Sequence, residues 1–166
     1  MTVALITHAA ARLHVTPEGH PERVARIETV GKTLNEAAFA PLSRHNARLP
    51  EAAELLRAHP QEYLDRIEAA TPVQGSIALD EDTHMSPGTW EAARRAAGAA
   101  CQAVDLVLGG EARRAFVAMR PPGHHAERSR PMGFCLLSNA AIAALHALDG
   151  HGLSRVAVLD FDVHHG

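Results

Sequence analysis

The apolar run Val156–Leu159 constrains the fold of this chain most, because it is uninterrupted and leads directly into a polar, histidine-rich tail. A strand with one solvated face alternates apolar and polar residues, whereas a strand covered on both faces is apolar throughout. We expect strands of the covered kind at Val3–Thr7, Ala115–Met119 and Arg155–Leu159. Helical patterns separate these strands, which indicates an α/β fold with a parallel sheet and helices on both faces.

The helical segments carry apolar residues at 3.6-residue spacing between recognisable start and stop residues. Ser86 is expected to cap a long alanine-rich helix, and Ser138 to cap the last one. A punctuated, acidic stretch at 71–83 is expected to be a surface loop. The length predicts a single domain at 1–166. Helices are expected at 21–39, 51–59, around 63–67, 87–108 and 139–148.

Composition excludes several classes of protein. Hydrophobic residues make up 46% of the chain and charged residues 21%, and no apolar run is long enough to span a membrane. The net charge of −3 comes from interleaved acidic and basic residues, so no basic face favours nucleic acid. Cys101 and Cys135 are too isolated for a disulfide framework or a metal pair, and reduced thiols suggest the cytoplasm.

Two loops rich in histidine follow two of the predicted strands. Arg120–His125 follows one strand, and Asp160–Gly166 follows the next after about 30 residues, the length of one crossover unit. Ligands of parallel sheets bind outside the carboxyl ends of the strands, so both loops are expected at one edge. In an extended tail, Asp160, Asp162 and His164 would point to the same side. A carboxylate and an imidazole together suit Zn²⁺ or a similar divalent ion.

Three motifs in this order resemble the zinc-dependent histone deacetylase family. They are RPPGHHA at Arg120–Ala126, Gly133-Phe134-Cys135, and DFDVHHG at Asp160–Gly166. The resemblance is strongest to the bacterial branch, which includes acetylpolyamine amidohydrolases and acetoin-utilisation proteins. It implies an arginase/deacetylase-like fold and hydrolysis of an acyl amide.

The resemblance also implies a role for each matching residue. Asp162 and His164 would be ligands of zinc, or of another divalent ion such as Fe²⁺. His124 and His125 would face the catalytic water, with His125 as general base. The remaining roles are for Asp160, which would orient His124 and help bind a structural potassium ion, and for Gly133 and Phe134, which would line the substrate tunnel.

Two groups that the family carries further downstream have no counterpart in this sequence. They are an aspartate that is the third zinc ligand and a tyrosine or histidine that polarises the scissile carbonyl. The sole tyrosine, Tyr63, lies in an early helix and does not match. The chain therefore resembles the amino-terminal half of a catalytic domain.

Two hypotheses about function follow. The chain is either a zinc-dependent amidohydrolase acting on acetylated lysine side chains or acetylpolyamines, or a truncated, inactive remnant of one. An arginase-like ureohydrolase ranks lower, because such enzymes use a two-metal cluster with more Asp-His pairs. An open sheet edge also predicts that the isolated chain is insoluble or self-associates.

Overall fold

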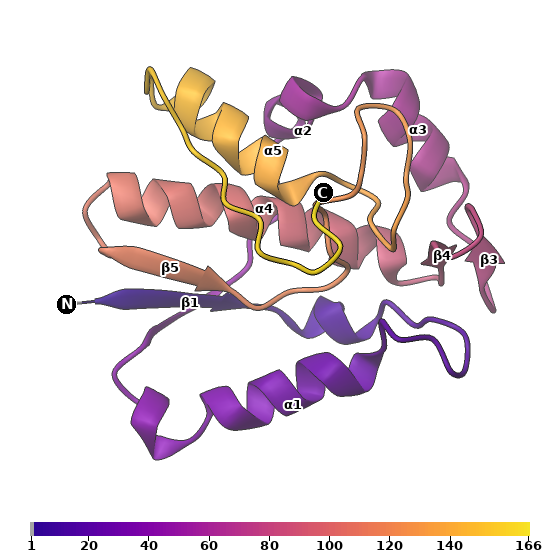
Figure 1. Ribbon diagram of the computed structural model, residues 1–166, viewed down its shortest axis with the longest axis horizontal. Helices are drawn as coiled ribbons and strands as arrows, with labels where there is room; N and C mark the ends of the chain where they lie inside the picture. The colour runs from indigo at the N-terminus through magenta and orange to yellow at the C-terminus, as the bar shows by residue number, and fades with distance from the viewer. Residues whose placement is uncertain (1) are drawn as a thin grey trace.

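The fold contains a parallel sheet of three strands in the order β2-β1-β5, of which Figure 1 shows β1 and β5 side by side. The computed structural model describes residues 2–166; Met1, which belongs to the predicted domain at 1–166, lies outside them. In register, Ala4 of β1 is opposite Ser43 of β2 and Ala115 of β5. The strands are β1 (Val3–Thr7), β2 (Ser43–Asn46) and β5 (Arg114–Val117). The α/β class with a parallel sheet is therefore confirmed.

Strand β2 was not predicted, because Ser-Arg-His-Asn carries no apolar residue. It forms an edge of the sheet and alternates half-buried with exposed side chains. Backbone pairing with β1 holds such a strand in place without any apolar signal of its own.

Helices cover both faces of the sheet, with α1 (Val24–Leu34) on one side and α4 (Thr89–Leu108) on the other (Figure 1). Small residues let α4 approach closely, and Ala99 packs against Ala4 and Ile6 of β1. Helix α1 has the expected amphipathic pattern, yet none of its residues is fully buried. A short 3₁₀ turn at Ala37–Phe39 follows it, so the helix predicted at 21–39 is two elements.

The start of α4 also differs from the prediction. Gly88, and not Ser86, is the residue that precedes the helix. The Ser86 hydroxyl instead donates to the carbonyl of Leu13 and accepts from the N–H of Val15. Ser86 thus ties the first loop to α4 instead of capping the helix.

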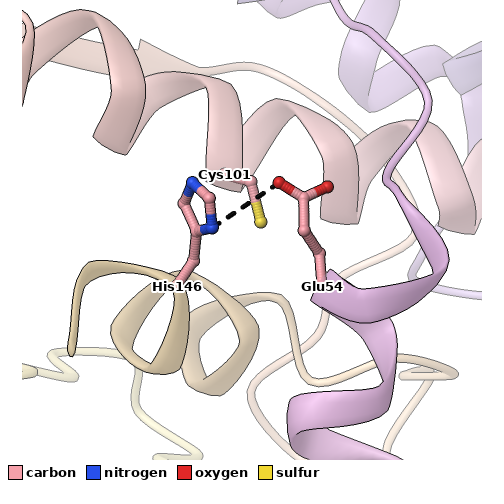
Figure 2. Close-up of side chains that lie close together, drawn as sticks. All are labelled: Glu54, Cys101 and His146. Carbon is pink, nitrogen blue, oxygen red and sulfur yellow. Dashed lines mark ion pairs between the residues drawn. The ribbon is translucent and has the colours of Figure 1, made fainter. Parts of the chain in front are cut away.

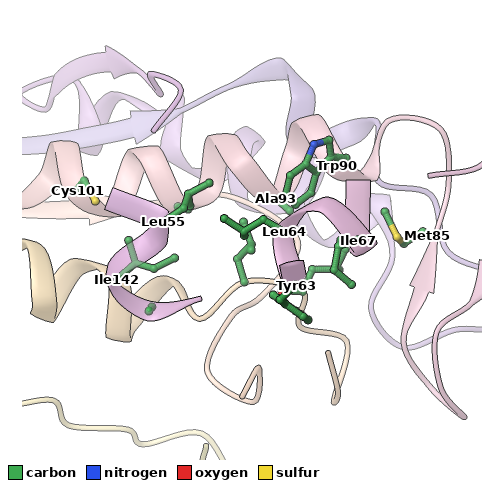
Figure 3. Close-up of a cluster of buried hydrophobic side chains, with 13 residues drawn as sticks. Leu55, Tyr63, Leu64, Ile67, Met85, Trp90, Ala93, Cys101 and Ile142 are labelled. Atoms are coloured by element: carbon green, nitrogen blue, oxygen red, sulfur yellow. The ribbon is translucent and has the colours of Figure 1, made fainter. Parts of the chain in front are cut away.

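A second core lies on the outer side of α4, where three further helices pack (Figure 3). Its largest members include Tyr63, Leu64, Trp90 and Ile142, which come from three different helices. The helices that build it with α4 are α2 (Ala52–Ala58), α3 (Gln61–Ala69) and α5 (Asn139–Leu145). This core holds α5 in place, and it also holds the loop that precedes α5.

Two smaller elements complete the fold. The region predicted as a loop contains one strand of a two-stranded antiparallel sheet, β3 (Ile77–Ala78) with β4 (His84–Met85). Helix α5 continues as a π-helical turn at His146–Gly150. These two elements together cover the helix that was predicted at 139–148. None of the helices in the described part of the chain has the length and apolarity needed to cross a membrane.

The strand predicted at Arg155–Leu159 is wrong. Residues 155–159 have no regular structure, and Val158 and Leu159 are 63% and 86% exposed. The segment passes β5 without pairing (Figure 1), and a cavity of about 680 Å³ separates the two, lined by Val117, Ala143 and Val156. An apolar run forms a covered strand only where a neighbouring strand and two covering layers are present. In the described part of the chain, residues 155–159 pair with no strand, and Val158 and Leu159 have no layer covering them.

Candidate acid–base and metal site

The loop that carries the tandem histidines begins at a buried arginine. Arg120 is 5% exposed, and its guanidinium donates to both carboxylate oxygens of Glu22, at 2.5 and 2.6 Å. It also donates to the carbonyls of Ala11 and His14, at 2.7 and 2.9 Å. Burial alone would raise the pKa of Glu22, but hydrogen bonds from His14 and Arg120 outweigh it and lower the pKa to about 2. A buried ion pair therefore anchors the start of this loop to the first loop of the chain.

The far end of the same loop is held by the helical core. The N–H of Ser138 donates to Nε2 of His59 at 2.9 Å, so Nδ1 of His59 carries the proton and donates to the carbonyl of Arg128 at 2.9 Å. Burial lowers the pKa of His59, which favours this neutral form. The Tyr63 hydroxyl donates to the carbonyl of Leu136 at 2.6 Å. Tyr63 is therefore a structural residue.

These contacts between the loop and distant residues were not predicted from the sequence. Glu22, His59 and Tyr63 lie more than 60 residues from the loop positions that they hold, and nothing in the local sequence links them. The buried polar character of Glu22 and His59 becomes visible only once the fold is known.

The tandem histidines meet the tail at one edge of the molecule. The rings of His124 and His125 lie 4.1 Å apart between centroids. Nδ1 of His124 lies 2.8 Å from Oδ2 of Asp160, an N–H to carboxylate contact that joins the two loops. The predicted meeting of the loops is therefore observed, while the catalytic roles assigned to these residues stay predictions.

Asp160 organises the tail around this contact. Its Oδ2 also accepts the N–H of Gly166 at 2.8 Å, and its Oδ1 accepts the N–H of Asp162 at 3.0 Å. These hydrogen bonds, from Gly166 first and then from His124 and Asp162, hold the pKa of Asp160 well below its usual range. The carboxylate is thus ionised and directed at His124. The potassium role predicted for Asp160 stays a prediction that none of these contacts supports.

The two predicted zinc ligands lie in a turn, so the expected extended alternation is wrong. Oδ1 of Asp162 accepts the N–H of His164 at 3.0 Å, which folds the tail back on itself. Both residues are exposed. Within the described residues, the two clusters that offer three metal-binding side chains include neither Asp162 nor His164.

The types of side chain present nevertheless suit a divalent metal. Asp162 offers a carboxylate and His164 an imidazole, the two ligand types that suit zinc or ferrous iron. A cavity of about 390 Å³ lies beside them and is lined by His124, Asp160 and Asp162 among others. Two such ligands are one fewer than a catalytic zinc usually takes from the protein.

Gly133 and Phe134 adopt left-handed backbone angles, with φ of +55° and +69°. A Cβ atom on Gly133 would lie 2.5 Å from Cδ2 of His125, so only glycine permits this approach to the ring. The N–H of Phe134 donates to Oγ1 of Thr83 at 3.0 Å, and its ring packs edge-on against His20 with centroids 4.7 Å apart. Gly133 therefore supports His125, and Phe134 faces the first loop instead of the cavity beside His124.

Comparisons with known proteins agree with this geometry. A profile of the histone deacetylase domain matches residues 20–166. The chain is 49% identical over 149 residues to a "Histone deacetylase-like amidohydrolase" of Pseudomonas aeruginosa, covering 89% of this chain and 39% of that protein. It is 37% identical over 177 residues to the human "Polyamine deacetylase HDAC10", covering 100% of this chain and 26% of that protein.

A solved structure matches the fold as well. The crystal structure of the HDA15 HD domain superposes with a TM-score of 0.84 at 30% identity, covering 90% of this chain and 44% of that one. The chain thus spans less than half the length of these three proteins.

Proposed function

Because the chain belongs to the histone deacetylase domain family, we propose that it carries the proton-transfer part of a metal-dependent amidohydrolase site. The substrates proposed are acetylated lysine side chains in proteins or acetylated polyamines, since one relative is a histone deacetylase-like amidohydrolase and another a polyamine deacetylase. The observation that carries the proposal is the 2.8 Å contact between His124 and Asp160, which brings the two histidine-rich loops into one site. The cytoplasm is the proposed compartment, since both cysteines are free and buried thiols.

The metal proposed is zinc or ferrous iron, held by Asp162 and His164. When bound, such an ion supplies Lewis acidity toward the amide carbonyl and makes a neighbouring water more acidic. All further chemistry falls to the side chains of the chain itself.

His125 is the proposed general base. It would accept the proton of the attacking water and return it to the nitrogen of the leaving amine, a transfer worth roughly 10²–10⁴-fold in rate. Asp160 accepts a hydrogen bond from Nδ1 of His124, which leaves Nε2 of that ring free to accept a proton or a hydrogen bond in the site. Gly133 keeps the space beside His125 clear of side chains. Phe134 stays the proposed apolar wall for the acylated chain of the substrate, which would then pass on the side of the first loop, where the Phe134 ring packs against His20.

A second candidate function is metal or ligand binding without turnover. It is favoured by the exposure of Asp162 and His164 and by their lack of a third ligand among the described residues. A site with two ligands binds a metal less tightly and positions a water less well than one with three.

Hydrolysis assays distinguish the two candidates. Release of acetate from an acetyl-lysine peptide and from N-acetylputrescine is measured with added Zn²⁺ for two proteins. One is this chain, and the other is a longer protein in which the chain continues into a family-type aspartate and tyrosine. In the longer protein, turnover that falls about 10²-fold or more in His125→Ala supports the proposal.

The matched control is His45→Ala on the edge strand, where the His45 ring contacts the hydroxyl of Ser43, and it is expected to leave turnover unchanged. Absence of turnover in the longer protein contradicts the amidohydrolase proposal. Metal binding by this chain without turnover, alongside an active longer protein, assigns the second function to the chain alone.

A further inference from the structure

A second group of metal-binding side chains lies far from the tandem histidines. Asp105 is near the end of α4, His146 is the first residue of the π turn that follows α5, and His151 directly follows that turn. In Figure 1 this end of α4 lies where β1 and β5 begin, opposite to the edge that holds the two histidine-rich loops. The group is thus independent of the function proposed above.

The three side chains converge on one point. Oδ1 of Asp105 lies 2.6 Å from Nε2 of His146 and 2.9 Å from Nε2 of His151. Ligands of a tetrahedral zinc, each about 2.0–2.1 Å from the ion, are about 3.3 Å apart. The observed distances of 2.6 and 2.9 Å are shorter than this spacing, as expected when protons rather than an ion link the atoms. Small rotations of the partly exposed side chains of Asp105 and His151 about the more buried His146 would open the group to the spacing of a metal site.

The π turn is what brings the two histidines together. In an α-helix, residues five apart point about 140° away from each other. Here the N–H of His151 donates to the carbonyl of His146 at 3.3 Å, and the two rings meet edge-on with centroids 5.0 Å apart. π-Helical turns are rare in proteins, and those that occur are frequently found at functional sites.

A carboxylate lies behind the inner histidine. Oε1 of Glu54, whose side chain is 4% exposed, lies 3.6 Å from Nδ1 of His146, with Cys101 beside the pair (Figure 2). Histidines that bind metals almost always direct their second ring nitrogen at such an oxygen. Glu54 is held in place by Arg48 and by the N–H of Glu51.

Two arginines contact this group, and their positive charge opposes the binding of a cation. Arg48 contacts Oδ2 of Asp105 at 3.0 Å, which leaves Oδ1 for a metal, and its charge is shared with Glu54. Nη1 of Arg57 donates to Nδ1 of His146 at 3.1 Å. When Nε2 of His146 binds a metal, Nδ1 carries the proton, so the contact with Arg57 gives way to one with Glu54.

We propose that Asp105, His146 and His151 form a second site for a divalent transition metal, of which Zn²⁺ is the best match. One carboxylate and two imidazoles, with a remaining position open to solvent, are a common zinc ligand set. The side chains of Asp105 and His151 are 39% and 30% exposed, so an ion can enter from solvent.

Metal titration of the 166-residue chain tests this proposal. Asp162→Ala and His164→Ala are introduced together to remove the tail ligands, and Zn²⁺ binding is followed by calorimetry and Co²⁺ binding by visible absorption. We expect one bound ion per chain and a cobalt spectrum of low coordination number. His151→Ala, which changes a partly exposed side chain, is expected to abolish both signals.

Two further variants sharpen the result. Glu54→Gln is expected to weaken binding about 10–100-fold, as loss of an outer carboxylate does elsewhere. His45→Ala is the matched control and is expected to bind like the parent. Urea unfolding midpoints establish that each variant is folded. A folded parent that binds no ion, or binding that persists in His151→Ala, overturns the proposal.

Discussion

The loop at 120–135 and the tail at 151–166 contain the two histidine-rich segments, Arg120–His125 and Asp160–Gly166, that were predicted to form one site, yet their surroundings differ. The loop is anchored at one end by the buried pair of Arg120 and Glu22 and at the other by His59. The tail is exposed along its length and is ordered mainly by hydrogen bonds to Asp160. The proton-transfer half of the site is therefore positioned by residues distant in sequence, while the ligand half is shaped by its own backbone.

The largest effect is expected from Arg120→Met. This change leaves the carboxylate of Glu22 buried without its main partner, which costs about 3–5 kcal/mol of unfolding free energy. Urea unfolding followed by circular dichroism measures it. Arg26→Met, at an exposed position on α1, is the control and is expected to change stability by about 0.5 kcal/mol or less.

A double variant refines this test. Arg120→Met with Glu22→Gln removes both charges, so part of the lost stability should return. Equal stability of Arg120→Met and the parent would show that the loop is not anchored through this pair.

The second prediction concerns acid unfolding. The pKa of Glu22 is lowered from 4.5 to about 2 in the folded chain, so the unfolded chain binds the proton more tightly. The stability that this carboxylate contributes is present above about pH 4.5 and is lost as the pH falls toward 2. A difference of this size corresponds to about 3–4 kcal/mol.

Glu22→Gln should accordingly lower stability at pH 7 and flatten its dependence on pH between about 4.5 and 2. Unfolding free energies at a series of pH values give the comparison, with the exposed Glu18→Gln as control. An unchanged slope in Glu22→Gln would assign the acid sensitivity to other carboxylates.

The contrast between loop and tail also explains how far sequence reasoning reached. The strand at Val3–Thr7 was predictable because its apolar run reports burial on both faces, and its three central residues are buried. The strand predicted at Ala115–Met119 exists as Arg114–Val117, but its residues alternate between exposed and half-buried. The same reasoning failed at Arg155–Leu159, since a local pattern cannot tell whether a neighbouring strand is there to pair with. Strand β2 was missed for the opposite reason, because pairing alone makes it a strand.

Within the site, the rule that parallel strands share a carboxyl edge predicted that the two loops meet, although the second of the two strands is absent. The contact of His124 with Asp160 was implied only by the resemblance to the deacetylase family. The turn in which Asp162 accepts the N–H of His164 was not predicted. An aspartate carboxylate can hydrogen-bond to nearby backbone N–H groups, and it does so here because no other contact holds the chain extended. The ion pair that holds Arg120 and the contact of Asp105 with His146 join residues distant in sequence, so the local sequence pattern did not predict them.

A third, smaller effect on stability is expected from Gly133→Ala. The new Cβ would lie 2.5 Å from Cδ2 of His125 on a backbone at φ +55°, so the ring must move. The strain of the left-handed angle costs about 1–2 kcal/mol, and the displaced His125 should lower any amidohydrolase activity further.

Gly75→Ala is a matched control, because Gly75 has a similar φ of +70° with open space around its Cβ position. Both variants should lose similar stability from strain, and only Gly133→Ala should shift the NMR signals of the His125 ring. Equal spectra in the two variants would contradict a supporting role for Gly133.

The smallest effect on stability is expected in the tail, from Val158→Ser. A side chain that is 63% exposed contributes little to the core, so the unfolding free energy should change by about 0.5 kcal/mol or less. Self-association should fall, because Val158 belongs to an exposed apolar row with Leu159, Phe161 and Val163. Sedimentation velocity over a range of concentrations measures association, and Val158→Ile is the control that keeps the apolar surface. A loss of more than about 2 kcal/mol in Val158→Ser would mean that Val158 is buried in solution, as in the strand that the sequence predicts, and the contrast between loop and tail would then disappear.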